Sequence, residues 1–277
     1  MLRFLKHEIK NNWKSFLFTY GLIIAAFFIL MIFILCVKNA DEPSVFVAIL
    51  YSNIVIIIVG SMVVSLVLFI INIIRSMYNS IFTDEGYLTL SFPESPDALL
   101  ISKILSNIIW ALLYLLSVGI GISFLFLVSG NIAGDLFEGI LGLISYVDGA
   151  LLTIPFTILE SCVGLILSFV ILMFSFTLIN IGFVRKAKVF LGIIVYFVIM
   201  YALATLQMLT GFLSFGLAID INGDLIFAYG SPLTETFYQN GAMTYVFDIT
   251  TFIINIGLII GLYILTRYLF KKHLELE

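Results

Sequence analysis

The chain has 277 residues, of which 62% are hydrophobic and 11% charged, with a formal net charge of −4 at neutral pH. A water-soluble domain carries about 25% charged residues, so this composition excludes a soluble catalytic domain. The lack of a basic stripe also excludes a nucleic-acid-binding protein. Because the apolar residues stand in long runs, and a membrane-spanning helix needs about 20 of them, we expect one transmembrane domain over residues 1–277.

The first 14 residues combine an apolar and a basic face at helical spacing. Leu2, Leu5, Ile9, Trp13 and Phe16 recur on one side, and Arg3, Lys6, Lys10 and Lys14 occupy the rest of the surface. The pattern fits an amphipathic helix in the headgroup layer, and it also fits a simple positively charged anchor. The predicted fold adopts the first reading, an N-terminal interfacial helix over residues 1–14.

Six apolar runs follow between residues 15 and 270, and each is long enough to span a bilayer. They cover about 15–37, 45–78, 99–128, 151–183, 189–215 and 246–270. The predicted fold class is therefore an all-α integral membrane protein with six transmembrane helices.

The charges predict the orientation of these helices. If both termini are cytoplasmic, 12 of the 13 basic residues lie on the cytoplasmic side, all except Lys38. Basic residues near the ends of spans are retained in the cytoplasm. The charged residues of the outer connections are then mainly acidic and include Asp41, Asp135 and Asp224.

Three connections are longer than a turn. The cytoplasmic stretch 75–103 mixes acidic and aromatic residues, and Ser95-Pro96-Asp97 is a typical helix start for the third span. The outer stretch 130–149 has one apolar helical face. The external loop 217–245 contains Asn222-Gly223 between two apolar runs, which predicts a tight β-hairpin.

Few charged residues fall inside the spans. Glu160 is an acidic residue in the outer half of the fourth span, and a carboxylate there should face protein or water. It either lines a transport path or stabilises a kink after Pro155 as a hydrogen-bonded neutral group. Gln207, Asn255 and Asn72 are weaker cases, with interhelical hydrogen bonding as the default reading.

Gly257 and Gly261 form a small-residue motif in the sixth span, which allows close helix packing within one subunit or between two. Catalytic motifs are absent from the sequence: it has no phosphate-binding loop, no His-Glu-x-x-His pattern and no nucleophile elbow. We therefore predict no catalytic and no metal-binding residues, and a chain that is not itself an enzyme.

The run from Tyr78 to Pro93, with sequence YNSIFTDEGYLTLSFP, resembles the loop between spans two and three of ABC-2 type permeases from Gram-positive bacteria. The six spans, the cytoplasmic ends and the amphipathic start fit the same family. Such proteins are the membrane subunits of ATP-binding-cassette exporters. The resemblance implies a multi-pass protein of the bacterial cell membrane that pairs with a second permease subunit, identical or different.

The resemblance also implies a separate cytoplasmic ATPase subunit that binds ATP and magnesium. The loop 78–94 would couple to it through Phe82, Asp84, Glu85, Tyr87 and Glu94, and the external loop would correspond to the family's re-entrant region. The apolar spans favour an amphipathic cargo, such as an antimicrobial peptide, a drug or a lipid-like molecule. The alternatives are a substrate-binding subunit of an importer and a membrane-embedded enzyme or sensor.

Overall fold

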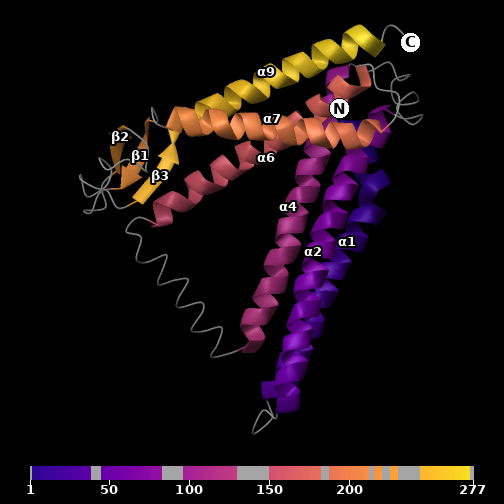
Figure 1. The fold of residues 1–277 in the computed structure, drawn as a ribbon, viewed down its shortest axis with the longest axis vertical. Coiled ribbons are helices and arrows are strands. Elements are labelled where there is room, and N and C mark those ends of the chain that lie inside the picture. Colours follow the sequence, from indigo (N-terminus) through magenta and orange to yellow (C-terminus); the bar gives the residue numbers. More distant parts are fainter. Residues whose placement is uncertain are drawn as a thin grey trace. The chain divides into compact units, whose positions relative to one another are not determined.

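The computed structural model describes residues 2–38, 45–82, 96–129, 150–181, 187–211, 215–219, 225–229 and 244–274. The chain forms two compact units, one from Met1 to Leu141 and one from Gly142 to Glu277. Figure 1 shows the helices and strands that make up each of them.

Six helices in the described part of the chain are long and apolar enough to cross a membrane, which confirms the predicted number. Their apolar windows are Phe4–Leu35, Val59–Asn79, Asp97–Phe124, Pro155–Asn180, Lys188–Gly211 and Ile249–Lys271. Helices satisfy their backbone hydrogen bonds internally, as a lipid environment requires. The chain is a multi-pass membrane protein, and the orientation of its helices stays a prediction from the charges.

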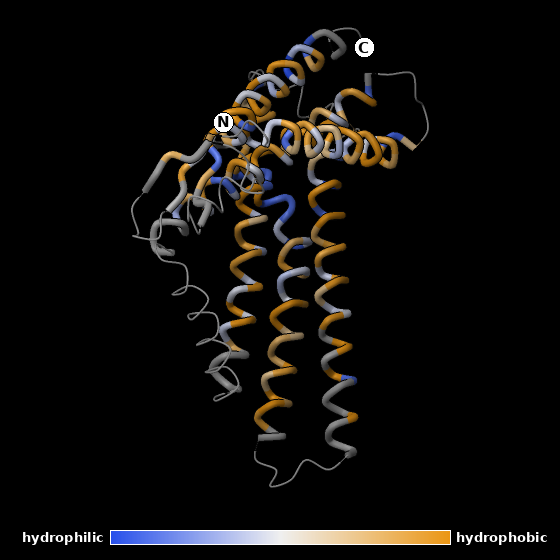
Figure 2. Tube along the Cα trace, turned by 60° about the vertical axis from the view of Figure 1, so that its left-hand side comes forward, coloured by the Kyte–Doolittle hydropathy of each residue, from blue (hydrophilic) through white to orange (hydrophobic). Residues whose placement is uncertain are grey.

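The first unit contains α1 (Leu2–Lys38), α2 (Val45–Phe82) and α4 (Pro96–Ser129). Both α2 and α4 pack along α1. At about 1.5 Å per residue, α1 and α2 are far longer than the hydrocarbon layer, which is about 30 Å thick. The tube in Figure 2 shows that the hydrophilic residues of α1 lie toward its N-terminal end, before the long apolar run.

The expected interfacial helix is not a separate element. α1 runs without interruption from Leu2 through the first span, and its N-terminal turns pack against other helices. Glu8 is buried, whereas Trp13, which was expected on the apolar face, is 44% exposed. Phe16, from the same predicted face, is fully buried, so the side that packs inward overlaps the predicted apolar face but is shifted toward Glu8.

Glycine permits a close approach of α1 and α4. A Cβ at Gly121 of α4 would overlap the ring of Phe27 from α1, and that ring is buried. Gly119, two residues earlier, has open space around the equivalent position. The contact with Phe27 therefore requires glycine at position 121.

The second unit contains α6 (Ala150–Ile181), α7 (Lys188–Gly211) and α9 (Ile249–Leu274). α6 packs against both other helices. A Cβ at Gly192 of α7 would overlap the buried ring of Phe176 from α6, so glycine again sets the distance between two helices.

A three-stranded antiparallel sheet joins α7 to α9. Its strands are β1 (Phe215–Ile219), β2 (Leu225–Tyr229) and β3 (Thr244–Asp248), in the order β2-β1-β3. Pairing of β1 with β2, with Ile219 opposite Leu225, confirms the hairpin predicted around Asn222-Gly223. The connecting residues 220–224 lie outside the described part of the chain.

The sequence predicted an all-α fold for the membrane-spanning part, and the structure has a small sheet in addition to these helices. In the described residues of the external loop the backbone forms strands, and β3 takes residues that had been assigned to the start of the sixth span. β-branched and aromatic residues such as Thr244, Tyr245 and Val246 favour strands. The stretch 130–149, expected to be amphipathic, lies outside the described residues.

Candidate functional site

A buried ion pair joins α1 to α4 in the first unit. Lys103 Nζ lies 2.5 Å from Glu8 Oε1, and the two side chains are 0% and 5% exposed. Glu8 and Phe16 lie two helical turns apart, and residues at this spacing share one face of a helix. Both are buried, so this face of α1 packs inward. Buried charges require partners of opposite sign, so this pair fixes how α1 and α4 pack together.

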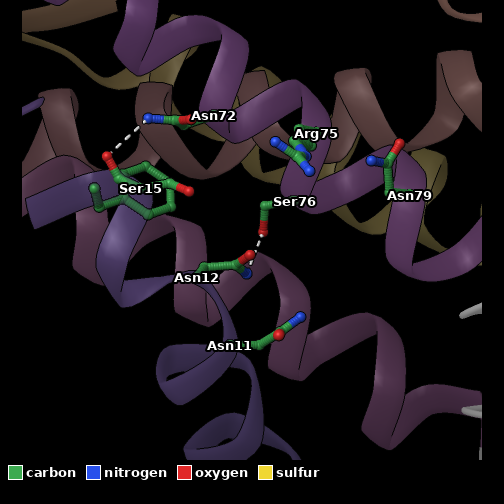
Figure 3. Close-up of a pocket in the computed structure, with 8 residues that line it drawn as sticks. Asn11, Asn12, Ser15, Asn72, Arg75, Ser76 and Asn79 are labelled. Carbon is green, nitrogen blue, oxygen red and sulfur yellow. Dashed lines mark hydrogen bonds between the residues drawn. The ribbon is translucent and has the colours of Figure 1, made fainter. Parts of the chain in front are cut away.

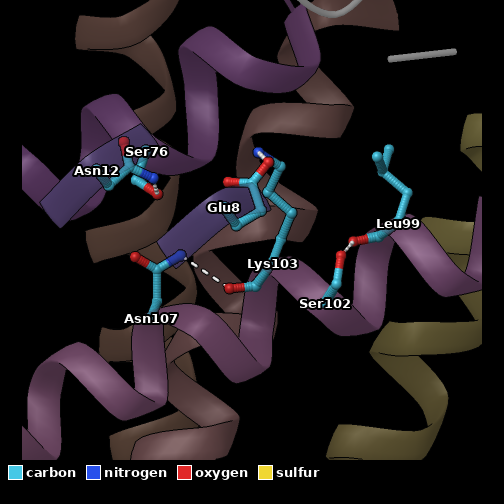
Figure 4. A network of polar contacts seen from close by, with 7 residues as sticks. All are labelled: Glu8, Asn12, Ser76, Leu99, Ser102, Lys103 and Asn107. Carbon is cyan, nitrogen blue, oxygen red and sulfur yellow. Dashed lines mark hydrogen bonds and ion pairs between the residues drawn. The ribbon is translucent and has the colours of Figure 1, made fainter. Parts of the chain in front are cut away.

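Further polar groups surround the pair and form what we name the polar cluster: Glu8, Asn12, Ser76, Ser102, Lys103 and Asn107 (Figure 4). Asn12 Nδ2 donates a 3.0 Å hydrogen bond to Ser76 Oγ, which links α1 to α2. Asn107 Nδ2 donates to the Lys103 carbonyl oxygen at 2.9 Å. The cluster thus connects the three helices of the first unit at one end.

Four buried polar atoms in and beside the cluster have no hydrogen-bond partner among the described residues. They are Glu8 Oε2, Ser106 Oγ, Asn107 Oδ1 and Trp110 Nε1. Buried polar groups without a partner are costly, and ordered water commonly satisfies such groups in proteins. At this end, the interface between α1 and α4 therefore contains buried polar atoms from both helices.

An aromatic layer lies next to the polar cluster. The rings of Phe16 and Trp110 stack with centroids 4.7 Å apart, and those of Phe69 and Tyr114 with centroids 4.3 Å apart. The hydroxyl of Tyr20 donates a 2.7 Å hydrogen bond to the carbonyl oxygen of Trp110. These contacts join α1, α2 and α4 next to the polar cluster.

A polar cavity of about 140 Å³ lies between α1 and α2 (Figure 3). Asn72 of α2 lines this cavity. Its Nδ2 donates hydrogen bonds to two groups of α1, Thr19 Oγ1 at 3.0 Å and the Ser15 carbonyl oxygen at 3.2 Å. The exposed guanidinium of Arg75 supplies positive charge to the lining.

The predicted coupling segment begins and ends at helices that belong to the same unit. Phe82 is the last residue of α2, and its ring lies 5.7 Å from that of Tyr78, so the first five residues of the segment are helical. α4 begins at Pro96 with Asp97 in its first turn, as the sequence predicted. The other predicted coupling residues lie outside the described part of the chain: Asp84, Glu85, Tyr87 and Glu94.

In the second unit, Glu160 is half-buried on α6, in the turn after Pro155. Asp248, the last residue of β3, lies near enough for electrostatic repulsion between the two carboxylates. Asp248 also caps α9, because its Oδ1 accepts a 3.1 Å hydrogen bond from the Thr251 backbone N–H. One end of this unit therefore holds two acidic groups from different elements.

Gln207 and Asn255 are brought together by the fold. Gln207 Nε2 donates a 2.7 Å hydrogen bond to Asn255 Oδ1, which joins α7 to α9. This is the interhelical bond that was the default reading of both residues. A Cβ atom at Gly257 or Gly261 would meet nothing within 4 Å among the described residues, so no close packing partner for these glycines lies there.

The described residues contain no group of three or more His, Cys, Asp or Glu side chains that could hold a metal ion.

Helices and site together define the chain as a multi-pass membrane protein with a polar cluster at one end of its first unit. No known family model, curated protein or solved structure matches the chain.

Sequence reasoning missed the polar cluster. Its signal was a stripe on the third span: Lys103, Ser106 and Asn107 lie on one helical face, at spacings of three and four residues. Glu8 is the one acidic residue before Asp41 and was hidden in a basic segment. Only the packing of α1 on α4 brings these two signals together.

Proposed function

We propose that the chain is the membrane-spanning permease subunit of an ATP-binding-cassette exporter of the ABC-2 type. A second permease subunit would complete the path, and a separate cytoplasmic ATPase subunit would bind ATP and magnesium. The resemblance of the Tyr78–Pro93 run to the coupling loop of that family supports this assignment, as does the predicted cytoplasmic position of 12 of the 13 basic residues, all except Lys38.

The geometric observation that carries the proposal is the polar cluster beside the two ends of the loop. α2 ends at Phe82 and α4 begins at Pro96. Near these ends, the Asn12–Ser76 hydrogen bond ties α2 to α1, and the Glu8–Lys103 ion pair ties α4 to α1. A force applied to the loop by an ATPase would therefore act on three joined helices, as coupling of hydrolysis to transport requires.

The cargo that we propose is amphipathic and carries positive charge. The spans are apolar, and Glu160 is a carboxylate within one of them, with Asp248 close by. Two acidic groups at the predicted outer end would attract a cationic peptide or drug. Gln207 and Asn255, which bond to each other, would line the path in this proposal.

The coupling role can be tested on the loop itself. Replacing Glu85 and Tyr87 together by alanine should weaken association with the ATPase or uncouple hydrolysis from transport. Loss of a charge-assisted contact costs about 1.5–3 kcal/mol, which is about tenfold or more in affinity. Pull-down yield, ATPase rate and transport are measured on the same preparations.

The matched control replaces Asp135 and Phe137 by alanine. These residues are another acidic and aromatic pair two positions apart, on the side predicted to be external. The proposal expects the control to assemble and couple as the wild type does. Unchanged assembly, hydrolysis and transport in the Glu85 and Tyr87 variant would contradict the coupling role.

A further inference from the structure

The cavity between α1 and α2 is polar and contains no carboxylate (Figure 3). α1 contributes Asn11, Asn12, Ser15 and Phe16, and α2 contributes Asn72, Arg75, Ser76 and Asn79. Its volume is about 140 Å³, whereas a water molecule takes about 30 Å³ in the liquid. The cavity can therefore hold a group larger than a single water, and the only formal charge in its lining is the positive charge of Arg75.

Part of the lining is already fixed by internal bonds. Asn12 Nδ2 donates to Ser76 Oγ at 3.0 Å, and Asn72 Nδ2 donates to the Ser15 carbonyl oxygen at 3.2 Å. By contrast, neither Arg75 nor Asn11 has a hydrogen-bond or ion-pair partner among the described residues, and both side chains are exposed. The cavity thus presents free N–H donors on a rigid frame.

The position of the cavity along α1 and α2 indicates whether its ligand comes from the lipid bilayer or from water. The cavity lies at the change in α1 from charged N-terminal turns to the apolar run, and at the end of the apolar window of α2 at Asn79. From this sequence pattern we expect the cavity to lie at the level of the membrane interface. Exposed Lys14 lies on the same stretch of α1, and basic residues at the interface attract anionic lipid headgroups.

We propose that this cavity binds a phosphate group. The guanidinium of Arg75 can donate two parallel N–H bonds to phosphate oxygens, and the Asn11 amide and the second N–H of Asn12 Nδ2 can donate to the others. A cation would be repelled by Arg75 and would find no carboxylate. At this depth the phosphate is that of a phospholipid headgroup, and free phosphate has the same chemistry. The inference does not depend on export.

The test is native mass spectrometry of the delipidated full chain, titrated with phosphatidylglycerol or with inorganic phosphate. The wild type should retain one phosphatidylglycerol. Arg75→Gln should bind it about tenfold more weakly or worse, and Arg75→Lys should fall between, because it keeps the charge but loses the paired donors. The Arg75 side chain is exposed, so both variants should fold.

Lys10→Gln is the matched control, since it removes an exposed positive charge from the same end of the unit without touching the cavity lining. It should bind phosphatidylglycerol almost as the wild type does. Displacement of the lipid by millimolar inorganic phosphate would identify free phosphate as the ligand, and resistance to displacement would identify the lipid. Equal binding by Arg75→Gln, or equal losses in Arg75→Gln and Lys10→Gln, would overturn the proposal.

Discussion

Glu8 and Lys103 place opposite charges at a buried helix interface, where they form an ion pair. Glu8 Oε1 has Lys103 as its partner, whereas Glu8 Oε2 has none among the described residues. Removal of one member of a buried pair leaves an uncompensated charge, and replacement of both by neutral groups of similar size avoids that penalty. The pair is therefore a sensitive point for the stability of the first unit.

We expect Glu8→Ala and Lys103→Met each to lower the free energy of unfolding by about 3–5 kcal/mol. The double variant Glu8→Gln with Lys103→Met should recover much of that loss. Thermal unfolding of the purified protein in detergent measures both effects, and Lys10→Ala, on the exposed side of α1, should change little. Single variants as stable as the wild type would show that the ion pair does not hold α1 to α4.

Glu160 offers a second test at the scale of one residue. Glu160→Gln keeps the shape of the side chain and most hydrogen bonding but deletes the charge. If Glu160 lines a wet path for cationic cargo, transport falls while folding and assembly persist. Transport at the wild-type rate, measured over a pH series with a confirmed cationic substrate, would leave Glu160 with a structural role alone.

The helices of each unit are held together by ring-to-glycine contacts as well as by polar ones. Phe27 of α1 packs on Gly121 of α4, and Phe176 of α6 packs on Gly192 of α7. Both rings are buried, so neither can move aside cheaply. These contacts set the spacing of the helices more strictly than the apolar side chains that face outward.

Gly121→Ala and Gly192→Ala should each destabilise the protein by about 1–3 kcal/mol, because overpacking shifts a buried ring or a helix. Gly119→Ala on the same helix as Gly121 should be neutral or stabilising by up to about 1 kcal/mol, since alanine favours a helix interior and the space there is open. Unfolding midpoints in detergent compare the three. Equal midpoints for Gly119→Ala and Gly121→Ala would contradict the contact.

The sequence predicted elements better than it predicted contacts. Hydropathy summed over some 20 residues is a strong signal, so the six spans were found, and Asn222-Gly223 indicated the hairpin because that dipeptide favours the backbone of a tight turn. β3 was missed because Asp248 alone separates its apolar residues, Val246 and Phe247, from the sixth span. The Gln207–Asn255 bond joins residues 48 positions apart, and such a pairing depends on how helices rotate against each other.

At the scale of the whole molecule, the charge distribution predicts a fixed orientation in the membrane. Cysteines placed at Asp135 or Asp224 should react with an impermeant thiol reagent in intact cells, and cysteines at Glu94 or Lys186 only after lysis. Cys162 is an exposed free thiol in the structure, so it and Cys36 are first replaced by alanine. The reverse labelling pattern would contradict the orientation.

The most direct test of the proposed function is purification of the full chain from its native cells in mild detergent, followed by assay of magnesium-dependent ATP hydrolysis and identification of what co-purifies. The exporter proposal predicts that an ABC ATPase subunit co-purifies and hydrolyses ATP. A chain that carries a tightly held small ligand and no ATPase would contradict the proposal and favour the importer subunit.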